Sequence, residues 1–242
     1  MIQVEGIFVG GGAISAPIIG EDFNWSGGDG TYQVLDDGGG NWRIKFLSSG
    51  TFTPLKDMVI DAFFVGGGGA SAGNYCGYGG AGYTTTVRSV VLTANTAYSI
   101  VVGAAGTNGN PSSAGGETTA FTASAAGGKN TSNGTSSSKR PGGAGGSGGA
   151  GYVSPVATTT GGTDGGDGTS SATTGGKGQG TTTREFGEAD GTLYASGGGS
   201  NLTATVSNSG NGGRNGITSI EPADGIVVIR QHKEVAAGDM QS

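Results

Sequence analysis

Apolar and polar residues alternate most clearly at positions 42–47, which read WRIKFL. Large apolar residues alternate there with basic ones, which is the period of a β-strand with one buried face. Other runs of β-branched and aromatic residues, bounded by turn clusters, are also typical of strands. They predict strands at 2–10, 31–35, 51–55, 58–65, 83–93, 97–104 and 225–230. No window has the 3.6-residue period of an amphipathic helix, so the pattern predicts an all-β fold with little or no helix.

The alternation stops between residues 104 and 224, where glycine-rich blocks alternate with Ser, Thr and Asn. The block GGAGGSGGAG at 142–151 repeats Gly-Gly-X, with Ala144, Ser147 and Ala150 as X. Such a block is either a flexible linker or a polyglycine II rod with three residues per turn. In such a rod, the X residues share one face. The other two faces carry only glycine backbone, whose amide and carbonyl groups form hydrogen bonds with neighbouring rods. We expect short strands that frame packed polyglycine II rods and their connecting loops.

Composition favours an ordered chain. The 242 residues include 56 glycines, but 33% are hydrophobic, only 12% are charged, and aromatic residues are spread along the chain. Disordered chains carry more charge and fewer aromatic residues. We divide the sequence into a β-rich head or attachment region (1–43), a glycine-rich domain (44–231) and a polar C-terminal tail (232–242).

The charge balance argues against nucleic acid as a partner. Acidic residues number 18 and basic residues 12, and phosphate backbones are bound by clustered Lys and Arg. No segment has the roughly 20 apolar residues of a membrane span, so we expect no membrane insertion. The start of the sequence lacks the pattern of a signal peptide, which favours synthesis in the cytoplasm. With Cys76 as its one cysteine, the chain has no internal disulfide framework.

Motifs that resemble catalytic or cofactor sites lack the context such sites need. The glycines at 77–82 spell G-x-G-x-x-G, but a strand follows where a dinucleotide site needs a helix. The acidic turns at 36–41 and 161–168 each offer only two carboxylates, too few for a hard cation. Glu185 and Glu188 are more typical of residues that flank a turn than of a catalytic pair. His232 lies in the polar tail, without Ser or Cys in a recognisable nucleophile motif. We therefore expect no enzyme activity, cofactor or metal.

Five motifs follow one another along residues 42–231: WRIKFLSSGTFTP, VIDAFFVGGGG, AYSIVVGAAGTNG, GQGTTTREFGEADGTLYASGGG and DGIVVIR. In this order they resemble the glycine-rich domain of bacteriophage and prophage tail-fibre proteins. A looser resemblance is to the tip adhesins of T-even-like phage long tail fibres, in which glycine blocks stack as polyglycine II rods. This chain departs from the pattern where the long glycine runs are broken, after the second strand and before the last one.

The resemblance implies rods near 66–69, 142–151, 161–168, 175–180 and 196–200, and surface-binding loops at 74–78, 128–140 and 201–215. Aromatic, Asn, Lys and Arg side chains in such loops suit carbohydrate or protein recognition, although they also suit a soluble loop without a ligand. The candidate receptor-binding residues are Tyr75, Tyr78, Lys129, Asn130, Asn133, Lys139, Arg140, Asn201, Asn208, Asn211 and Arg214.

Two functions fit this reading. The first is a tail-fibre protein of the virion, whose rigid scaffold presents loops to a bacterial surface glycan or outer protein and which assembles with other fibre subunits or with copies of itself. The second is a purely structural fibre spacer or assembly segment without receptor contact. An ice-binding face is a weaker alternative, because the X positions of the glycine blocks are mixed.

Overall fold

The computed structural model describes residues 16–73, 76–132, 142–151, 183–199, 205–214 and 219–232. Within these residues, ten strands and one short 3-10 turn follow one another along the chain. The strands are β1 (Phe23–Trp25), β2 (Tyr32–Gly38), β3 (Asn41–Phe46), β4 (Gly50–Pro54), β5 (Met58–Val65), β6 (Thr84–Leu92), β7 (Tyr98–Ile100), β8 (Thr118–Ala120), β9 (Ala123–Ala125) and β10 (Ile226–Gln231). The turn is η1 (Glu185–Gly187). The predicted all-β fold is confirmed.

Most of the predicted strands are present with nearly the predicted bounds. The exception is 97–104, of which only Tyr98–Ile100 pairs with β4. The Val101 amide donates to the Thr119 carbonyl, and the amides of Val102 and Gly103 donate to the side chains of Ser49 and Thr118. The three-residue strands β1, β8 and β9 were not predicted, since so short a run carries no readable alternation. The predicted strand 2–10 lies outside the described residues.

Two sheets pack face to face around an aromatic and aliphatic core. One sheet has the order β1-β4-β7 and the other β2-β3-β10-β5-β6, while β8 and β9 form a separate hairpin. The alternation in WRIKFL is confirmed, because Trp42, Ile44 and Phe46 lie in this core. Phe52 from the smaller sheet and Phe64 from the larger one are both fully buried there.

The five-stranded sheet is also covered on its other face. Phe63, Val65 and Val228 point to that side and pack against Phe186 and Tyr194 of the segment 183–195. Polar residues continue the same face beyond this second core. The sheet therefore lies between two layers, and its far face carries the charged residues described below.

Strands of the proposed head region belong to the same sheets as the rest. β1 pairs with β4, and β2 pairs with β3. β3 itself spans Asn41–Phe46 and so crosses the boundary suggested at residue 43.

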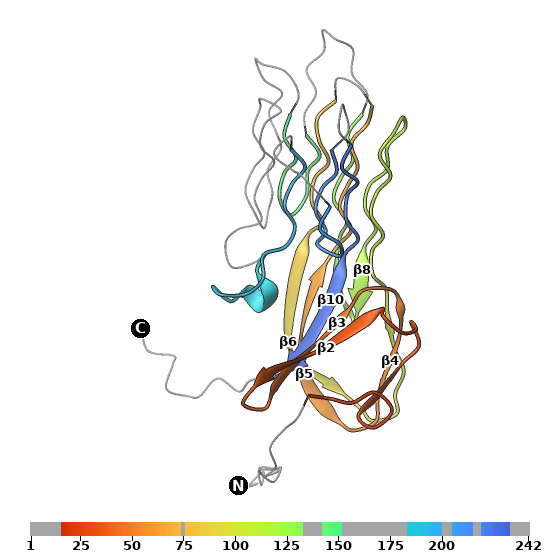
Figure 1. The fold of residues 1–242 in the computed structure, drawn as a ribbon, viewed down its shortest axis with the longest axis vertical. Coiled ribbons are helices and arrows are strands. Elements are labelled where there is room, and N and C mark those ends of the chain that lie inside the picture. Colours follow the sequence, from red (N-terminus) through yellow and green to blue (C-terminus); the bar gives the residue numbers. More distant parts are fainter. Residues whose placement is uncertain are drawn as a thin grey trace, which may run out of the picture.

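Glycine-rich segments continue the strands beyond one end of the sandwich (Figure 1). β5 runs directly into residues 66–72, and residues 78–83 run into β6. Segments 113–117 and 221–225 likewise lead into β8 and β10, and β9 leads into 126–132. The sandwich therefore delivers several glycine-rich segments side by side in one bundle, here called the glycine bundle.

The amides of segment 66–71 point in turn to different neighbours. Gly66 and Gly69 donate to Tyr83 and Gly80 of one neighbour, and Gly67 and Ala70 donate to Gly116 and Ser113 of another. Each of these pairs lies three residues apart, which is the period of a helix with three residues per turn. Gly68 donates to Ala223, and Ser71 donates to the side chain of Asn108. This is the hydrogen-bond pattern of a polyglycine II rod.

Segment 78–83 repeats the pattern. Its amides donate in turn to segments 147–150, 210–213 and 126–129, again with a period of three residues. The pairs are Tyr78 to Ala150 and Ala81 to Ser147, Gly79 to Gly213 and Gly82 to Gly210, and Gly80 to Lys129 and Tyr83 to Ala126. Its carbonyls accept from segments 66–69 and 143–146 and from Gly198. The predicted rod at 66–69 is therefore present, and 78–83 is a rod that the sequence did not predict.

Close backbone contact explains the glycines. A Cβ atom on Gly67 would overlap the Ala104 carbonyl, and one on Gly79 would overlap the Gly69 carbonyl. Overlap with backbone cannot be relieved by a side-chain rotation. Gly79, Gly80 and Gly82 are thus packing positions, and a strand follows their G-x-G-x-x-G pattern where a dinucleotide site needs a helix.

The block GGAGGSGGAG is a hairpin of two short rods, so the prediction of one rod at 142–151 is wrong. The chain bends at Gly146 and Ser147, and the Gly149 amide then donates to the Gly143 carbonyl at 2.9 Å. Both arms flank segment 78–83. At about 3.1 Å per residue, one straight rod of the whole block would be longer than this neighbour. The predicted rods 161–168 and 175–180 lie outside the described residues, and Gly198 of 196–200 is packed in the bundle.

Candidate functional site

Segment 183–195 forms a small lobe on the outer face of the five-stranded sheet. Arg184 and Leu193 form an antiparallel bridge, and η1 lies between them. Phe186 has a φ of 57° and is buried, with its ring 6.2 Å from that of Phe63. The Arg230 guanidinium lies over the same ring at 4.2 Å. The Phe186 side chain holds the lobe on the sheet, and charged residues surround it.

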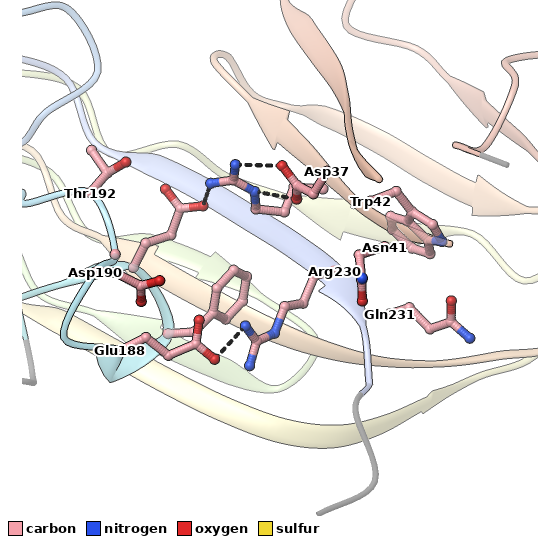
Figure 2. Close-up of a pocket in the computed structure, with 12 residues that line it drawn as sticks. Asp37, Asn41, Trp42, Glu188, Asp190, Thr192, Arg230 and Gln231 are labelled. Atoms are coloured by element: carbon pink, nitrogen blue, oxygen red, sulfur yellow. Dashed lines mark hydrogen bonds and ion pairs between the residues drawn. The ribbon is translucent and has the colours of Figure 1, made fainter. Parts of the chain in front are cut away.

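A pocket of about 270 Å³ opens where the lobe meets the sheet (Figure 2). Its walls come from the β2–β3 turn, the end of β10 and the lobe. The lining residues are Asp37, Asn41, Trp42, Arg43, Glu185, Phe186, Glu188, Asp190, Gly191, Thr192, Arg230 and Gln231. The lining combines two guanidinium groups with several carboxylates.

Arg43 joins one side of the pocket to the other. Its Nε and Nη2 donate to the two oxygens of Asp37, each at 2.7 Å, and its Nη1 pairs with Glu185 Oε1. The hydrogen bonds to Asp37, and then those to Glu185, raise the pKa of Arg43 above its ordinary value against the effect of burial. Asp37 was one of the two carboxylates of the acidic turn at 36–41. Its oxygens are occupied by Arg43.

Glu185 is buried beneath Arg43 and has two further partners. Lys45 Nζ lies 3.3 Å from Glu185 Oε2, and the Tyr194 hydroxyl donates to the same oxygen at 3.2 Å. Burial, and then the nearby Glu185 charge, raise the pKa of Tyr194 above its ordinary value. A buried carboxylate needs such partners, so Glu185 holds the lobe on the sheet.

Arg230 extends the network from the pocket into the sheet. Its Nη1 lies 2.6 Å from Glu188 Oε1, and its Nε lies 3.2 Å from Asp61 Oδ2. Glu188 and Glu185 thus flank the η1 turn, as predicted, and each pairs with an arginine of the sheet. The guanidinium groups of Arg43 and Arg230 are both paired with carboxylates of the pocket wall. We therefore interpret the pocket as part of the contact between the lobe and the sheet. It has room for a small polar molecule.

The second candidate surface is the end of the glycine bundle that lies away from the sandwich. The yellow-green loop around residues 105–112 reaches this end (Figure 1). Asn108 ties the loop down: its Oδ1 accepts from the Ser71 amide at 2.8 Å, and its Nδ2 donates to the carbonyls of Arg214 and Ile220. Thr107, Asn110 and Pro111 of this loop are exposed. It is therefore a fixed polar surface.

The predicted receptor-binding residues that the structure describes are spread over the bundle and its junction with the sandwich. Tyr75, Asn133, Lys139, Arg140 and Asn201 lie outside the described residues. Among the others, Tyr78 is buried in the bundle and Lys129 is exposed. The Arg214 amide donates to the Ile220 carbonyl near the free end.

Three of the predicted asparagines hold segments of the chain together. Asn130 Nδ2 donates to the Ser112 carbonyl at 2.8 Å, and Asn211 Oδ1 accepts from the Ser196 amide at 2.9 Å. Asn208 Nδ2 donates to the carbonyls of Leu47 and Gly225, at the junction of sandwich and bundle. These polar groups are used within the fold.

The described part of the chain contains no group of three or more His, Cys, Asp or Glu side chains that could hold a metal ion. Among the described residues, no helix has the length and apolar character needed to cross a bilayer.

Fold and site together define the class: a β-sandwich extended by a hydrogen-bonded glycine bundle. A family model described as a glycine-rich domain matches residues 47–230. The chain belongs to this family. A search of the curated proteins finds no match to it.

Proposed function

We propose that this chain is a tail-fibre protein of a phage or prophage, in which the glycine bundle is a rigid scaffold for loops that bind a bacterial surface. The observation that carries the proposal is the bundle itself. Its segments bond backbone to backbone in register, and Asn108 ties the loop at its end to two of them.

A fixed loop lowers the entropy that binding would otherwise cost. Each rotamer-rich side chain that is ordered on binding costs about 0.5–1.5 kcal/mol. A loop already held by Asn108 avoids part of this cost. The same arrangement tolerates sequence change at residues 109–111, because the loop is tied to the rods by the side chain of Asn108.

The partners we propose are a bacterial cell-surface glycan or outer protein, and other tail-fibre subunits or copies of this chain. The site of action would be the tail fibre of the virion. Support for these partners comes from the resemblance of the motifs to tail-fibre domains, and membership in the glycine-rich family supports only the glycine-rich scaffold. The acidic charge balance supports a partner other than nucleic acid.

The runner-up function is a structural spacer. The paired charges of the lobe favour it, because they strengthen the fold without exposing a ligand site. A spacer needs a stiff bundle but places no demand on residues 109–111. The two functions therefore differ in what the loop sequence does.

The experiment compares binding of the labelled protein to a panel of bacteria that includes the host of the encoding phage or prophage. The loop variant replaces residues 109–111 with Gly-Ser-Gly and keeps the anchors Asn108 and Ser112. The control replaces Thr96 and Ala97 with serine, in the turn after β6, at the opposite end of that strand from the bundle.

Strain-selective labelling that the loop variant loses and the control keeps would support the receptor-binding function. A second loop variant that removes residues 133–140 extends the test to the predicted binding loop 128–140. If the folded protein fails to label the host, or if all variants label it equally, the spacer function replaces this proposal.

A further inference from the structure

Ser89 occupies an irregular position in β6. In the pairing of β5 with β6, Ile60 faces Val90 and Ala62 faces Val87, so Arg88 and Ser89 together face one residue. This is a β-bulge, a device that redirects a side chain. Ser89 has a φ of 56°, in the left-handed region that costs a non-glycine residue about 1–3 kcal/mol. The strained backbone holds an exposed serine at this point of the sheet.

The residue facing the bulge is Asp61, and His232 lies between it and the serine. His232 Nδ1 is 2.6 Å from Asp61 Oδ1, and His232 Nε2 is 3.0 Å from Ser89 Oγ. The His232 amide donates to the Val59 carbonyl at 3.0 Å, which fixes the ring just beyond β10. The neighbouring strands β5 and β6 thus contribute Asp61 and Ser89, and the residue after β10 contributes His232, to a Ser–His–Asp chain.

Asp61 is held as a carboxylate. It is fully buried, and its Oδ2 lies 3.1 Å from Arg88 Nη1 and 3.2 Å from Arg230 Nε. Burial raises the pKa of Asp61, but hydrogen bonds from His232, the Ser89 amide and Arg230 outweigh it and hold the pKa below its ordinary value. An ionised carboxylate only accepts hydrogen bonds.

The charge state of Asp61 decides which imidazole nitrogen carries the proton. Because Asp61 only accepts, His232 Nδ1 is the donor of the 2.6 Å contact. In a neutral imidazole, Nε2 is then the acceptor, and Ser89 is the donor of the 3.0 Å contact. This is the order of hydrogen bonds in which an imidazole acts as general base for a serine nucleophile.

We propose that Ser89 is an activated serine that takes acyl groups from small activated esters. Ser89 Oγ forms a bond to the ester carbonyl carbon, and its proton passes to His232 Nε2. The bond from that carbon to the alcohol oxygen breaks, and the alcohol leaves with the proton from His232. Water then repeats the step, which releases the carboxylic acid and restores Ser89.

One contact limits how fast this reaction can be. The Ser89 amide donates to Asp61 Oδ1 at 3.2 Å, so it is not free to hold the oxyanion that develops on the carbonyl. Loss of one oxyanion donor typically costs about 100–1,000-fold in rate. The site therefore suits electrophiles that react readily, and covalent labelling will be easier to observe than turnover.

Asp61 acts through His232 and is a positioning residue. A purely structural His–Asp pair would hold β10 against β5 and would not change the reactivity of Ser89. The reactivity of the serine therefore separates the two roles. This inference is independent of the proposed binding function, because it concerns the sandwich and not the bundle.

The test labels the folded full chain with an alkyl fluorophosphonate and maps the adduct by mass spectrometry. The variants are Ser89→Ala, His232→Asn, which keeps a donor for Asp61 but removes the base, and Ser99→Ala as a matched exposed strand serine. Release of p-nitrophenol from p-nitrophenyl acetate gives a second readout, and melting temperatures show which variants fold.

We expect one adduct on Ser89. It should be absent in Ser89→Ala, unchanged in Ser99→Ala and slower by about 100-fold in His232→Asn. No adduct on Ser89 in the folded protein would overturn the proposal. An adduct that forms equally fast in a folded His232→Asn variant would also overturn it, and would leave the histidine with a structural role.

Discussion

The sandwich and the glycine bundle are both tightly packed, but by opposite means. In the sandwich, side chains such as Phe46, Phe52 and Phe64 fill the space between sheets. In the bundle, Gly67 and Gly79 have no side chain, and carbonyls of neighbouring segments occupy the space that a Cβ would need. The first core is held by burial of apolar surface, and the second by lateral backbone hydrogen bonds.

This difference implies that the bundle depends on the sandwich. A backbone hydrogen bond contributes only about 0.5–1.5 kcal/mol net, and ordering glycine costs more than ordering any other residue. Strands such as β5 and β10 deliver the glycine segments already aligned, so part of the ordering is done before the rods form.

The largest expected effect comes from the sandwich core. Phe64→Ala should lower the free energy of unfolding by about 3–5 kcal/mol, because Phe64 is fully buried. If the bundle depends on the sandwich, glycine amide signals should be lost in the same denaturant transition as tryptophan fluorescence. Rods that persist after the sandwich unfolds would show that the bundle does not depend on the sandwich.

The next effect comes from the joint between lobe and sheet. Glu185→Gln leaves Arg43 and Lys45 without their shared buried carboxylate. Removing one partner of a buried ion pair costs about 3–5 kcal/mol, and we expect about 3 kcal/mol here because Arg43 is partly exposed. The measurement is chemical denaturation, with Asp190→Asn in the same lobe as control. Equal stability of the two variants would show that the lobe is not held by this carboxylate.

A neighbouring pair of glycines sharpens the comparison inside the bundle. A Cβ on Gly115 would overlap the Gly67 carbonyl, whereas one on Gly116 would meet its nearest atom, the Ala104 amide nitrogen, at 3.0 Å. Gly115→Ala should cost about 1–3 kcal/mol and Gly116→Ala clearly less. Thermal melts of both variants test this, and equal melting temperatures would contradict backbone packing at Gly115.

Acid should weaken the sandwich through Asp61. Its pKa is lowered in the folded chain, so its contribution to stability is present above the ordinary value of 3.8. That contribution is lost as the pH falls through the folded pKa, because the unfolded chain then binds the proton more readily. Melting temperature against pH should fall more steeply below about pH 4 in the wild type than in Asp61→Asn. Parallel curves would assign the acid loss to other carboxylates.

The smallest effect is expected at the surface. Lys56 and Asp22 form an ion pair at 2.7 Å, but Lys56 is highly exposed and such pairs contribute little. Lys56→Gln should leave the melting temperature unchanged within error. A clear loss would show that exposed charges matter more in this glycine-rich fold than in ordinary proteins.

Local patterns predicted the elements that follow simple rules. The alternation in β3 and the apolar run in β5 are visible from a few residues, and the period of three in Gly-Gly-X already indicates a rod. The bend at Gly146 and Ser147 was missed because Gly-Gly-X looks the same whether the chain runs straight or turns back.

The candidate sites were less predictable because they are assembled across the sheet. Asp61, Ser89 and His232 stand far apart in the sequence and meet only because β10, β5 and β6 are neighbours. The sequence around Ser89 contains no glycine or proline that would indicate a bulge. The alternation in β3 predicts that Arg43 and Lys45 face solvent. The lobe that covers them comes after a long glycine-rich stretch, from which the sequence does not indicate which part of the sheet the lobe will contact.

Hydrogen exchange of the glycine amides tests the central claim most directly. Gly67 and Gly80 donate to Gly116 and Lys129 inside the bundle, both at 3.0 Å, whereas Gly30 lies in an exposed turn. Assigned NMR spectra in D₂O should show the first two amides exchanging as slowly as those of β5 and β10, and Gly30 exchanging within the dead time. Exchange of Gly67 and Gly80 at the rate of an unfolded chain would show that the glycine-rich region is a flexible linker, and would contradict a core built from backbone.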